Sequence, residues 1–226
     1  MKRWEELPEY MRNEQTAPYY EILSHKRGEL ALKRIFDFTM SAVLLVLLIP
    51  VMLVIGAAVK LTSPGEVIFR QVRVTTYGKR FYIYKFRTMV TGAPGKGSQV
   101  TVSGDARVTG IGKFLRKVRL DELPQLFNIL KGEMSFVGTR PEVEKYVERY
   151  KPEMYATLLM PAGVTSTASI EYKDEERLLS GGKDVDETYV NEILPAKMEY
   201  NLQYIKNYSL CKDILIVFHT VLAVFF

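Results

Sequence analysis

An acidic pair followed by a helical pattern is the part of this sequence best suited to chemistry. Asp121 and Glu122 precede an apolar pattern that has Pro124 in its first turn and Gly132 directly after its end. This punctuation predicts a helix with Asp121 as its N-cap. A carboxylate at that position meets free backbone N–H groups and the positive end of the helix dipole, which keep it ionised and can hold a phosphate beside it.

Basic residues around this pair indicate an anionic partner. Arg116 precedes the pair, and Arg140 follows it after a second turn. An anionic substrate would therefore meet cations close to an acidic nucleophile or metal ligand. The alternative is a helix cap with ordinary surface charges around it, and on the residues alone that alternative is favoured because acidic N-caps are common.

Two more basic residues, Lys85 and Arg87, belong to the second of two strand-like segments. The segments, 67–69 and 81–86, are joined through 75–78 and predict a β-hairpin. Because side chains alternate along a strand, Lys85 and Arg87 are expected on the same face. There they either bind phosphate or form a basic rim that faces a membrane.

Other catalytic arrangements have little support. The chain has two histidines and a single cysteine, Cys211. It therefore has no internal disulfide, and a Ser-His or Cys-His nucleophile pair or a histidine-rich metal site is not expected. No GxxxxGKS or GxxxxGKT phosphate-binding loop occurs. Asp184 and Asp186 have the spacing with which metal-dependent glycosyltransferases hold a nucleotide sugar, but a solvated loop is the favoured interpretation.

A long uncharged segment indicates contact with a membrane. Residues 38–59 comprise 22 positions without a charge. As a helix at about 1.5 Å per residue they reach roughly 33 Å, enough for a hydrocarbon core of about 30 Å. Pro50, near the middle, breaks such a helix. Because basic residues flank both ends, the segment either enters and leaves by one face or spans the bilayer as a kinked helix, and both interpretations stay open.

The chain as a whole predicts one domain with an appendage. Its 226 residues are 47% hydrophobic and carry a net charge of +5, which favours anionic partners. We divide it into an N-terminal extension, 1–32, a re-entrant membrane helix, 33–60, and a catalytic domain on the cytoplasmic face, 61–226. The extension is expected to wrap on the domain or to lie on the membrane.

Three further segments of the catalytic domain carry predictions. A glycine-rich loop at 91–104 is of the kind that covers a site. A long helical pattern extends over 187–207. The apolar segment 214–226 is too short to span a bilayer, so it is expected to lie in the interface or to pack against the first apolar segment.

Five motifs are informative because they occur in one order. They are KRIFD at 33–37, IFRQVR at 68–73, YKFRTM at 84–89, DARVTGIGKFLR at 105–116 and LDELPQLFNILKGEMSFVGTRPE at 120–142. Together they resemble the bacterial sugar transferase family, also called monotopic phosphoglycosyl transferases. The resemblance implies an α+β, mostly helical fold. It also implies a monotopic membrane protein with a Pro-broken re-entrant helix, a small β-hairpin and interfacial amphipathic helices.

The chemistry implied by this resemblance is the transfer of a sugar-1-phosphate from a UDP-sugar to polyprenyl (undecaprenyl) phosphate, with release of UMP. Asp121 is expected to attack the sugar-bearing phosphorus and form an aspartyl phosphosugar, which the lipid phosphate resolves. Glu122 is expected to assist, and Arg140 and Arg116 to bind the phosphates.

The resemblance also implies a cofactor and partners. Mg²⁺ is expected, with Asp121 as a ligand, because a carboxylate that attacks a diphosphate brings anions together. Lys85 and Arg87 are further candidates for phosphate binding. The expected partners are UDP-sugar, polyprenyl phosphate and membrane lipid, without nucleic acid, and a homodimer is left open. The expected location is the cytoplasmic face of the bacterial inner membrane, at the first membrane step of exopolysaccharide or glycoconjugate synthesis.

Two other classes of function stay open. One is a metal-dependent glycosyltransferase that uses Asp184 and Asp186 and releases UDP. The other is a non-catalytic membrane anchor of a polysaccharide assembly complex, in which Asp121 would have no chemical role.

Overall fold

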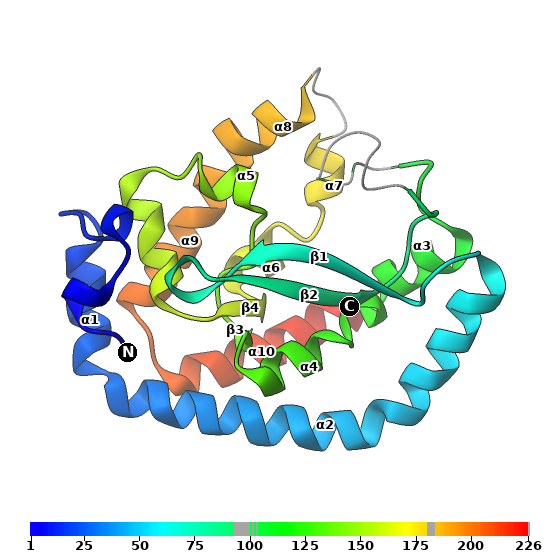
Figure 1. Ribbon diagram of the computed structural model, residues 1–226, viewed down its shortest axis with the longest axis horizontal. Helices are drawn as coiled ribbons and strands as arrows, with labels where there is room; N and C mark the ends of the chain where they lie inside the picture. Colours follow the sequence, from blue (N-terminus) through cyan, green and yellow to red (C-terminus); the bar gives the residue numbers. More distant parts are fainter. Residues whose placement is uncertain (93–99, 101, 103, 180–183, 226) are drawn as a thin grey trace.

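The computed structural model describes residues 1–92, 100, 102, 104–179 and 184–225. Its longest element is α2 (Arg27–Thr62), which curves along one side of the molecule, and the rest of the chain lies within this curve (Figure 1). Most of the other elements are short helices, with one β-hairpin and one parallel strand pair. The predicted α+β, mostly helical class is confirmed.

The middle of helix α2, residues 38–59, is an uncharged and mostly apolar run, and the charged residues of the helix stand toward its two ends. Within the described part of the chain it is the one helix long and apolar enough to cross a membrane, and only 17% of its most apolar window is buried. The expected break at Pro50 is not seen: the helix continues through this residue. Proline removes one hydrogen bond and strains the turn before it, but the apolar residues on both sides keep the helical conformation.

The predicted β-hairpin is confirmed. Strands β1 (Ile68–Val74) and β2 (Arg80–Phe86) pair antiparallel, with Ile68 opposite Phe86. The turn between them uses left-handed conformations at Tyr77 and Gly78, which a tight reversal requires. The glycine-rich loop expected at 91–104 lies largely outside the described residues.

A second, parallel strand pair joins β3 (Met134–Val137) to β4 (Ala162–Thr165). Two glycines let the backbones approach at the end of this pair, because a Cβ on Gly163 would lie 2.1 Å from the nitrogen of Gly138. The segment that leaves β3 is therefore held directly against β4, and this segment carries Arg140.

The remaining helices surround these strands. The predicted helical pattern over 187–207 is confirmed, since a short helix, one π-helical turn (Tyr189–Ile193) and a longer helix follow one another there. The helices not yet given are α1 (Ala17–His25), α3 (Gly110–Lys117), α4 (Gln125–Lys131), α5 (Glu144–Val147), α6 (Thr167–Glu171), α7 (Glu175–Leu178), α8 (Val185–Thr188), α9 (Leu194–Lys206) and α10 (Leu210–Phe225).

The N-terminal segment is part of the core. Leu7, Met11, Tyr19 and Leu23 are buried in the largest hydrophobic cluster, together with residues of α9. Further 3-10 turns at Trp4–Glu6, Glu9–Met11 and Pro152–Leu159 complete this region. Of the two expectations for the extension, wrapping on the domain is the one observed.

Helix α10 packs against α2, as expected for the apolar segment 214–226. A buried ion pair joins Lys33 of α2 to Asp213 of α10 at 2.5 Å. The hydroxyl of Tyr204 donates to the other carboxylate oxygen of Asp213 at 2.7 Å. Arg34 donates to the carbonyl oxygens of Ile129 and Leu130 at 2.7 and 2.8 Å, so α2 also holds the C-terminal end of α4.

Candidate active site

Asp121 and Glu122 lie in a 3-10 turn (Leu120–Glu122) that connects α3 to α4. The prediction that Asp121 is the N-cap of the following helix is wrong, because Pro124 occupies the N-cap of α4 and no side chain caps it. The turn is possible because Arg119 adopts a left-handed conformation and reverses the chain after α3. Gly132 follows the end of α4 in a left-handed conformation, as predicted.

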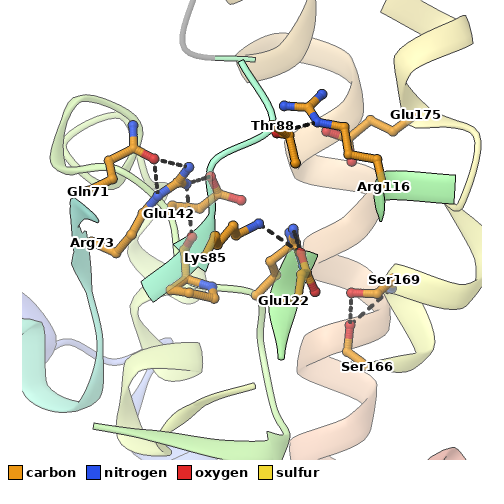
Figure 2. Close-up of polar contacts among 12 residues, drawn as sticks. Gln71, Arg73, Lys85, Thr88, Arg116, Glu122, Glu142, Ser166, Ser169 and Glu175 are labelled. Atoms are coloured by element: carbon orange, nitrogen blue, oxygen red, sulfur yellow. Dashed lines mark hydrogen bonds and ion pairs between the residues drawn. The ribbon is translucent and has the colours of Figure 1, made fainter. Parts of the chain in front are cut away.

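Glu122 is held by two cations. Nζ of Lys85 and Nη2 of Arg140 both donate to its Oε1, at 2.7 and 2.6 Å. Figure 2 shows Lys85, from the end of β2, pointing toward Glu122. Burial alone would raise the pKa of Glu122, but Arg140 and Lys85 outweigh it and hold this pKa well below its ordinary value. Glu122 is therefore an ion that fixes the two cations.

Asp121 has the opposite electrostatic environment. It is 6% exposed, and burial raises its pKa above the ordinary aspartyl value. The charge of Glu122 raises it further, whereas Lys85, Arg116 and Arg140 act to lower it. The helix N-terminus that was expected to favour the ionised form of Asp121 is absent, because Asp121 caps no helix, and burial acts against ionisation. The same interactions show that the structure gathers Lys85, Arg116 and Arg140 around the acidic pair.

Arg116 is positioned from α3. This helix begins at a true cap, where the hydroxyl of Thr109 accepts from the backbone N–H of Gly112. Nε of Arg116 donates to the hydroxyl of Thr88 at 3.0 Å, which ties α3 to the segment after β2 (Figure 2).

Arg87 is directed elsewhere. Its Nη2 donates to the carbonyl oxygen and the hydroxyl of Ser63 at 2.7 and 2.8 Å, where α2 has unpaired carbonyl groups at its end. Strand β2 ends at Phe86, so the alternation that placed Lys85 and Arg87 on one face no longer holds at Arg87. The contacts of Arg87 attach the hairpin to α2.

The loop that carries Arg140 is held in place by contacts to the two residues that follow Arg140. Arg73 of β1 donates to the carbonyl oxygen of Pro141 at 3.0 Å and pairs with Glu142 at 3.8 Å. The hydroxyl of Tyr189 donates to Glu142 at 2.6 Å. Figure 2 shows Arg73 and Glu142 on the far side of Lys85 from Glu122. This support holds the guanidinium of Arg140 at Glu122.

A pocket of about 250 Å³ opens beside Glu122, the neighbour of Asp121 in the chain. Glu122 and Arg140 line it, and so does Gln125, the first residue of α4. Gln125 did not emerge as a functional residue from sequence reasoning. The available signal was its position four residues before Ile129, on the face of α4 that is otherwise apolar and buried.

The described residues contain no cluster of three or more histidine, cysteine or acidic side chains that could hold a metal ion. Asp184 instead caps α8, accepting from the backbone N–H groups of Asp186 and Glu187 at 3.0 and 3.1 Å. Asp186 accepts from the hydroxyl of Tyr146 at 2.7 Å and pairs with Lys145. This pair of aspartates therefore has a structural role at the start of α8, so the favoured interpretation as a solvated loop is wrong about the element.

Comparison with known proteins gives matches over the part of the chain that contains these site residues. The model of the bacterial sugar transferase family matches residues 28–226, so the chain belongs to this family. It is 39% identical over 194 residues to the UDP-N-acetylgalactosamine-undecaprenyl-phosphate N-acetylgalactosaminephosphotransferase of Aeromonas hydrophila. It is 42% identical over 193 residues to the UDP-glucose:undecaprenyl-phosphate glucose-1-phosphate transferase of Klebsiella pneumoniae. Each match covers 84% of this chain but only 43% and 39% of the relative, so the chain spans less than half the length of these two proteins.

Proposed function

We propose that this chain is a phosphoglycosyl transferase that moves a sugar-1-phosphate from a UDP-sugar to polyprenyl (undecaprenyl) phosphate and releases UMP. The observation that carries the proposal is the buried Asp121 beside Glu122, whose carboxylate is fixed by Lys85 and Arg140. The names of the two relatives, which specify a UDP-sugar donor and undecaprenyl phosphate, support the choice of substrates. Such a transfer would be the first membrane step of exopolysaccharide or glycoconjugate synthesis.

Asp121 acts as the nucleophile in this proposal. Its carboxylate oxygen bonds to the sugar-bearing phosphorus, the bond from this phosphorus to UMP breaks, and an aspartyl phosphosugar remains. An oxygen of the lipid phosphate then bonds to the same phosphorus and releases the carboxylate. Burial supports this role, because a carboxylate with little water around it has less hydration to lose before it attacks.

Glu122, Lys85, Arg116 and Arg140 position the phosphates. Because Oε1 of Glu122 already accepts from both Lys85 and Arg140, Glu122 orients these two cations, and the three side chains together keep a positive charge for the substrate. The bidentate geometry of a guanidinium suits Arg140 to a phosphate that arrives beside Glu122. The pocket beside Glu122 gives the substrates access to the pair.

The donor set around the site fits Mg²⁺. This ion is commonly held by one or two carboxylates and by substrate phosphates, and Asp121 is the carboxylate here that forms no ion pair with a cation within the described residues. When bound, Mg²⁺ would offset the negative charge that builds up between a carboxylate and a diphosphate. Asp121 would be its protein ligand.

The re-entrant arrangement of α2 is part of the proposal. Both ends of α2 are attached to one domain, through Arg34 at the start and through the bonds from Arg87 to Ser63 at the end. A helix with its two ends on opposite sides of a bilayer could not hold a single soluble domain in this way. The proposal therefore puts α2 in one leaflet and the domain on the cytoplasmic face of the inner membrane, where UDP-sugars are available.

The experiment that tests the reaction identifies the nucleotide product. Purified protein is incubated with a panel of UDP-sugars, Mg²⁺ and polyprenyl phosphate, and UMP and UDP are separated. We expect UMP from at least one donor, and no UMP from Asp121→Asn. UDP as the product would support the glycosyltransferase alternative instead. Absence of both nucleotides with every donor, or full turnover by Asp121→Asn, would contradict the proposal.

A further inference from the structure

Gln125 is a buried side chain with unmet hydrogen-bonding capacity. It is 1% exposed, and within the described residues neither its Oε1 nor its Nε2 has a partner. Buried amides are nearly always hydrogen-bonded, because leaving both polar atoms unpaired loses the interactions they had with water. Gln125 lines the pocket beside Glu122. A molecule bound in that pocket can therefore supply the missing partner.

The pocket has two chemically different sides. Its charged side carries Glu122 and Arg140, with Arg119 and Lys173 as further cations. Its apolar side includes Leu44 and Leu48 of α2, which are four residues apart and so share one helix face, and Ala223 of α10. Gln125 and Thr220 add polar groups to the lining.

The size of the pocket limits what it can enclose. At about 250 Å³ it is smaller than the range of roughly 300–1,000 Å³ that holds a whole small molecule. It therefore takes one end of a larger molecule. A sugar does not fit the apolar side, because its hydroxyl groups would lose their water without gaining partners. An amphiphile with an anionic group next to hydrocarbon matches both sides.

The helix that supplies Leu44 and Leu48 to the pocket also carries exposed apolar side chains. Val43 and Leu47 lie next to Leu44 and Leu48 in the same helix and are exposed. A hydrocarbon chain that leaves the pocket along α2 would thus pass onto an apolar surface, as a lipid anchored in a bilayer requires.

We propose that this pocket binds the head of the polyprenyl phosphate acceptor, with its first isoprene units between α2 and α10. Gln125 donates its amide N–H to an oxygen of the lipid phosphate, and Oε1 accepts from a water that enters with it. Gln125 thereby orients the oxygen that attacks the aspartyl phosphosugar. As that oxygen bonds to phosphorus, the bond from phosphorus to Asp121 breaks and the carboxylate is restored. This inference rests on the proposed function and adds an acceptor site to it.

Helix α10 is one wall of this site. The hydroxyl groups of Thr220 in α10 and Thr165 in β4 are 2.7 Å apart, so the wall is attached to the strand beside the Arg140 loop. Ala223 lies on the same side of α10, and a larger side chain there would fill space that the isoprene units need. Val221 is half exposed and does not line the pocket, which makes it a matched control for added bulk.

The test separates the two halves of the reaction. Gln125→Leu, Ala223→Phe and the control Val221→Phe are compared in two assays: the burst of UMP without lipid, and turnover with polyprenyl phosphate. We expect the parent burst from the control Val221→Phe. For Gln125→Leu and Ala223→Phe we expect a loss that falls on turnover with lipid more than on the burst, and the remaining burst shows that these variants fold. The KM for the lipid should rise about tenfold for Gln125→Leu, the effect of one lost hydrogen bond to a charged group in a dry site. Ala223→Phe should raise it as well, and Val221→Phe should not.

Two results would overturn the proposal. If Gln125→Leu reduces the UMP burst and leaves the KM for the lipid unchanged, the pocket serves the sugar donor. If Gln125→Leu and Ala223→Phe both keep the parent KM, the pocket does not bind the acceptor.

A binding measurement distinguishes failure of this inference from failure of the proposed function. Polyprenyl phosphate should raise the Tm of the parent protein more than the uncharged polyprenol does, and this difference should be smaller for Gln125→Leu. If this difference appears without any UMP burst, the acceptor site stands and the proposed reaction is wrong. If the burst appears and the difference does not, the reaction stands and the acceptor site is wrong.

Discussion

Two adjacent carboxylates have separate tasks in this site because their surroundings differ. Burial raises the pKa of Asp121, whereas Arg140 and Lys85 hold the pKa of Glu122 far below its ordinary value. Two neighbouring acids whose pKa values are pushed apart commonly divide the work of a reaction. Glu122 stays charged and fixes the cations, and Asp121 is the group that the chemistry can use.

This difference predicts the pH dependence of the donor half-reaction. Only the ionised form of Asp121 attacks, so the UMP burst should slow as the pH falls through its raised pKa. The acid limb of the burst rate should therefore lie above the ordinary aspartyl value of about 3.9. The groups that act on Asp121 are Glu122, which raises its pKa, and Lys85, Arg116 and Arg140, which lower it.

Arg116→Gln provides the control for this pH dependence. Because Arg116 lowers the pKa of Asp121, its removal should move the acid limb to still higher pH. An acid limb at the ordinary aspartyl pKa in the parent protein, or a shift to lower pH in the variant, would contradict this account of the site.

Site residues could be predicted from the sequence only where the residues that define their role are close to them in the chain. Asp121, Glu122 and Arg140 stand out because a turn, a helix and a basic residue follow one another closely. The contacts of Arg87 with Ser63 and the burial of Gln125 arise between segments that are far apart in the chain. No local pattern of residue types contains this information.

At the scale of elements, α2 and the domain are joined at both ends of the helix. Near its start Arg34 binds the end of α4, and at its end Ser63 is bound by Arg87 from the hairpin. The sequence predicted an apolar helix here correctly, because length and lack of charge are local properties. It did not predict a continuous helix through Pro50, since whether the helix tolerates a proline depends on the packing around it.

The re-entrant arrangement predicts which side of the membrane each end of α2 faces. Gly28 lies in the first turn of α2 and Glu66 lies four residues after its end, and both are exposed; a Cβ at Gly28 meets no atom within 4 Å. In a background with Cys211→Ser, which removes the exposed native thiol, Gly28→Cys and Glu66→Cys should both react with a membrane-impermeant maleimide in inverted vesicles. Neither should react in intact cells. Labelling of the two positions from opposite sides would establish a spanning helix instead.

At the scale of the whole molecule, the N-terminal segment belongs to the catalytic domain. The family match begins at residue 28, yet Leu7, Met11, Tyr19 and Leu23 are buried in the largest core cluster. The hairpin and the helices of 187–207 were predictable from the alternation and periodicity of their own residues. The attachment of residues 1–25 was not, because a polar and aromatic segment has no pattern that identifies its partner.

This packing predicts that residues 1–25 stabilise the domain that carries the active site, although none of them belongs to that site. Met11 is fully buried, so Met11→Ala should lower the free energy of unfolding by about 2–5 kcal/mol, the usual cost of a large-to-small change in a core. The exposed neighbour Arg12→Ala should leave it within about 0.5 kcal/mol. Denaturant titration in detergent measures both, and the UMP burst of folded Met11→Ala should match the parent. Equal stability of the two variants would mean that the segment is not part of the core.

The hydrogen bonds from Arg34 to the end of α4 affect how such a protein would respond to bilayers of different thickness. Through these bonds α2, which we propose lies in one leaflet, directly contacts the end of the helix that follows the acidic pair. In a thicker or thinner membrane, α2 and the acidic pair would then move together along the bilayer normal, and the distance between them would stay constant. In such an enzyme the lipid composition should therefore affect the strength of membrane binding far more than the turnover rate of the membrane-bound enzyme.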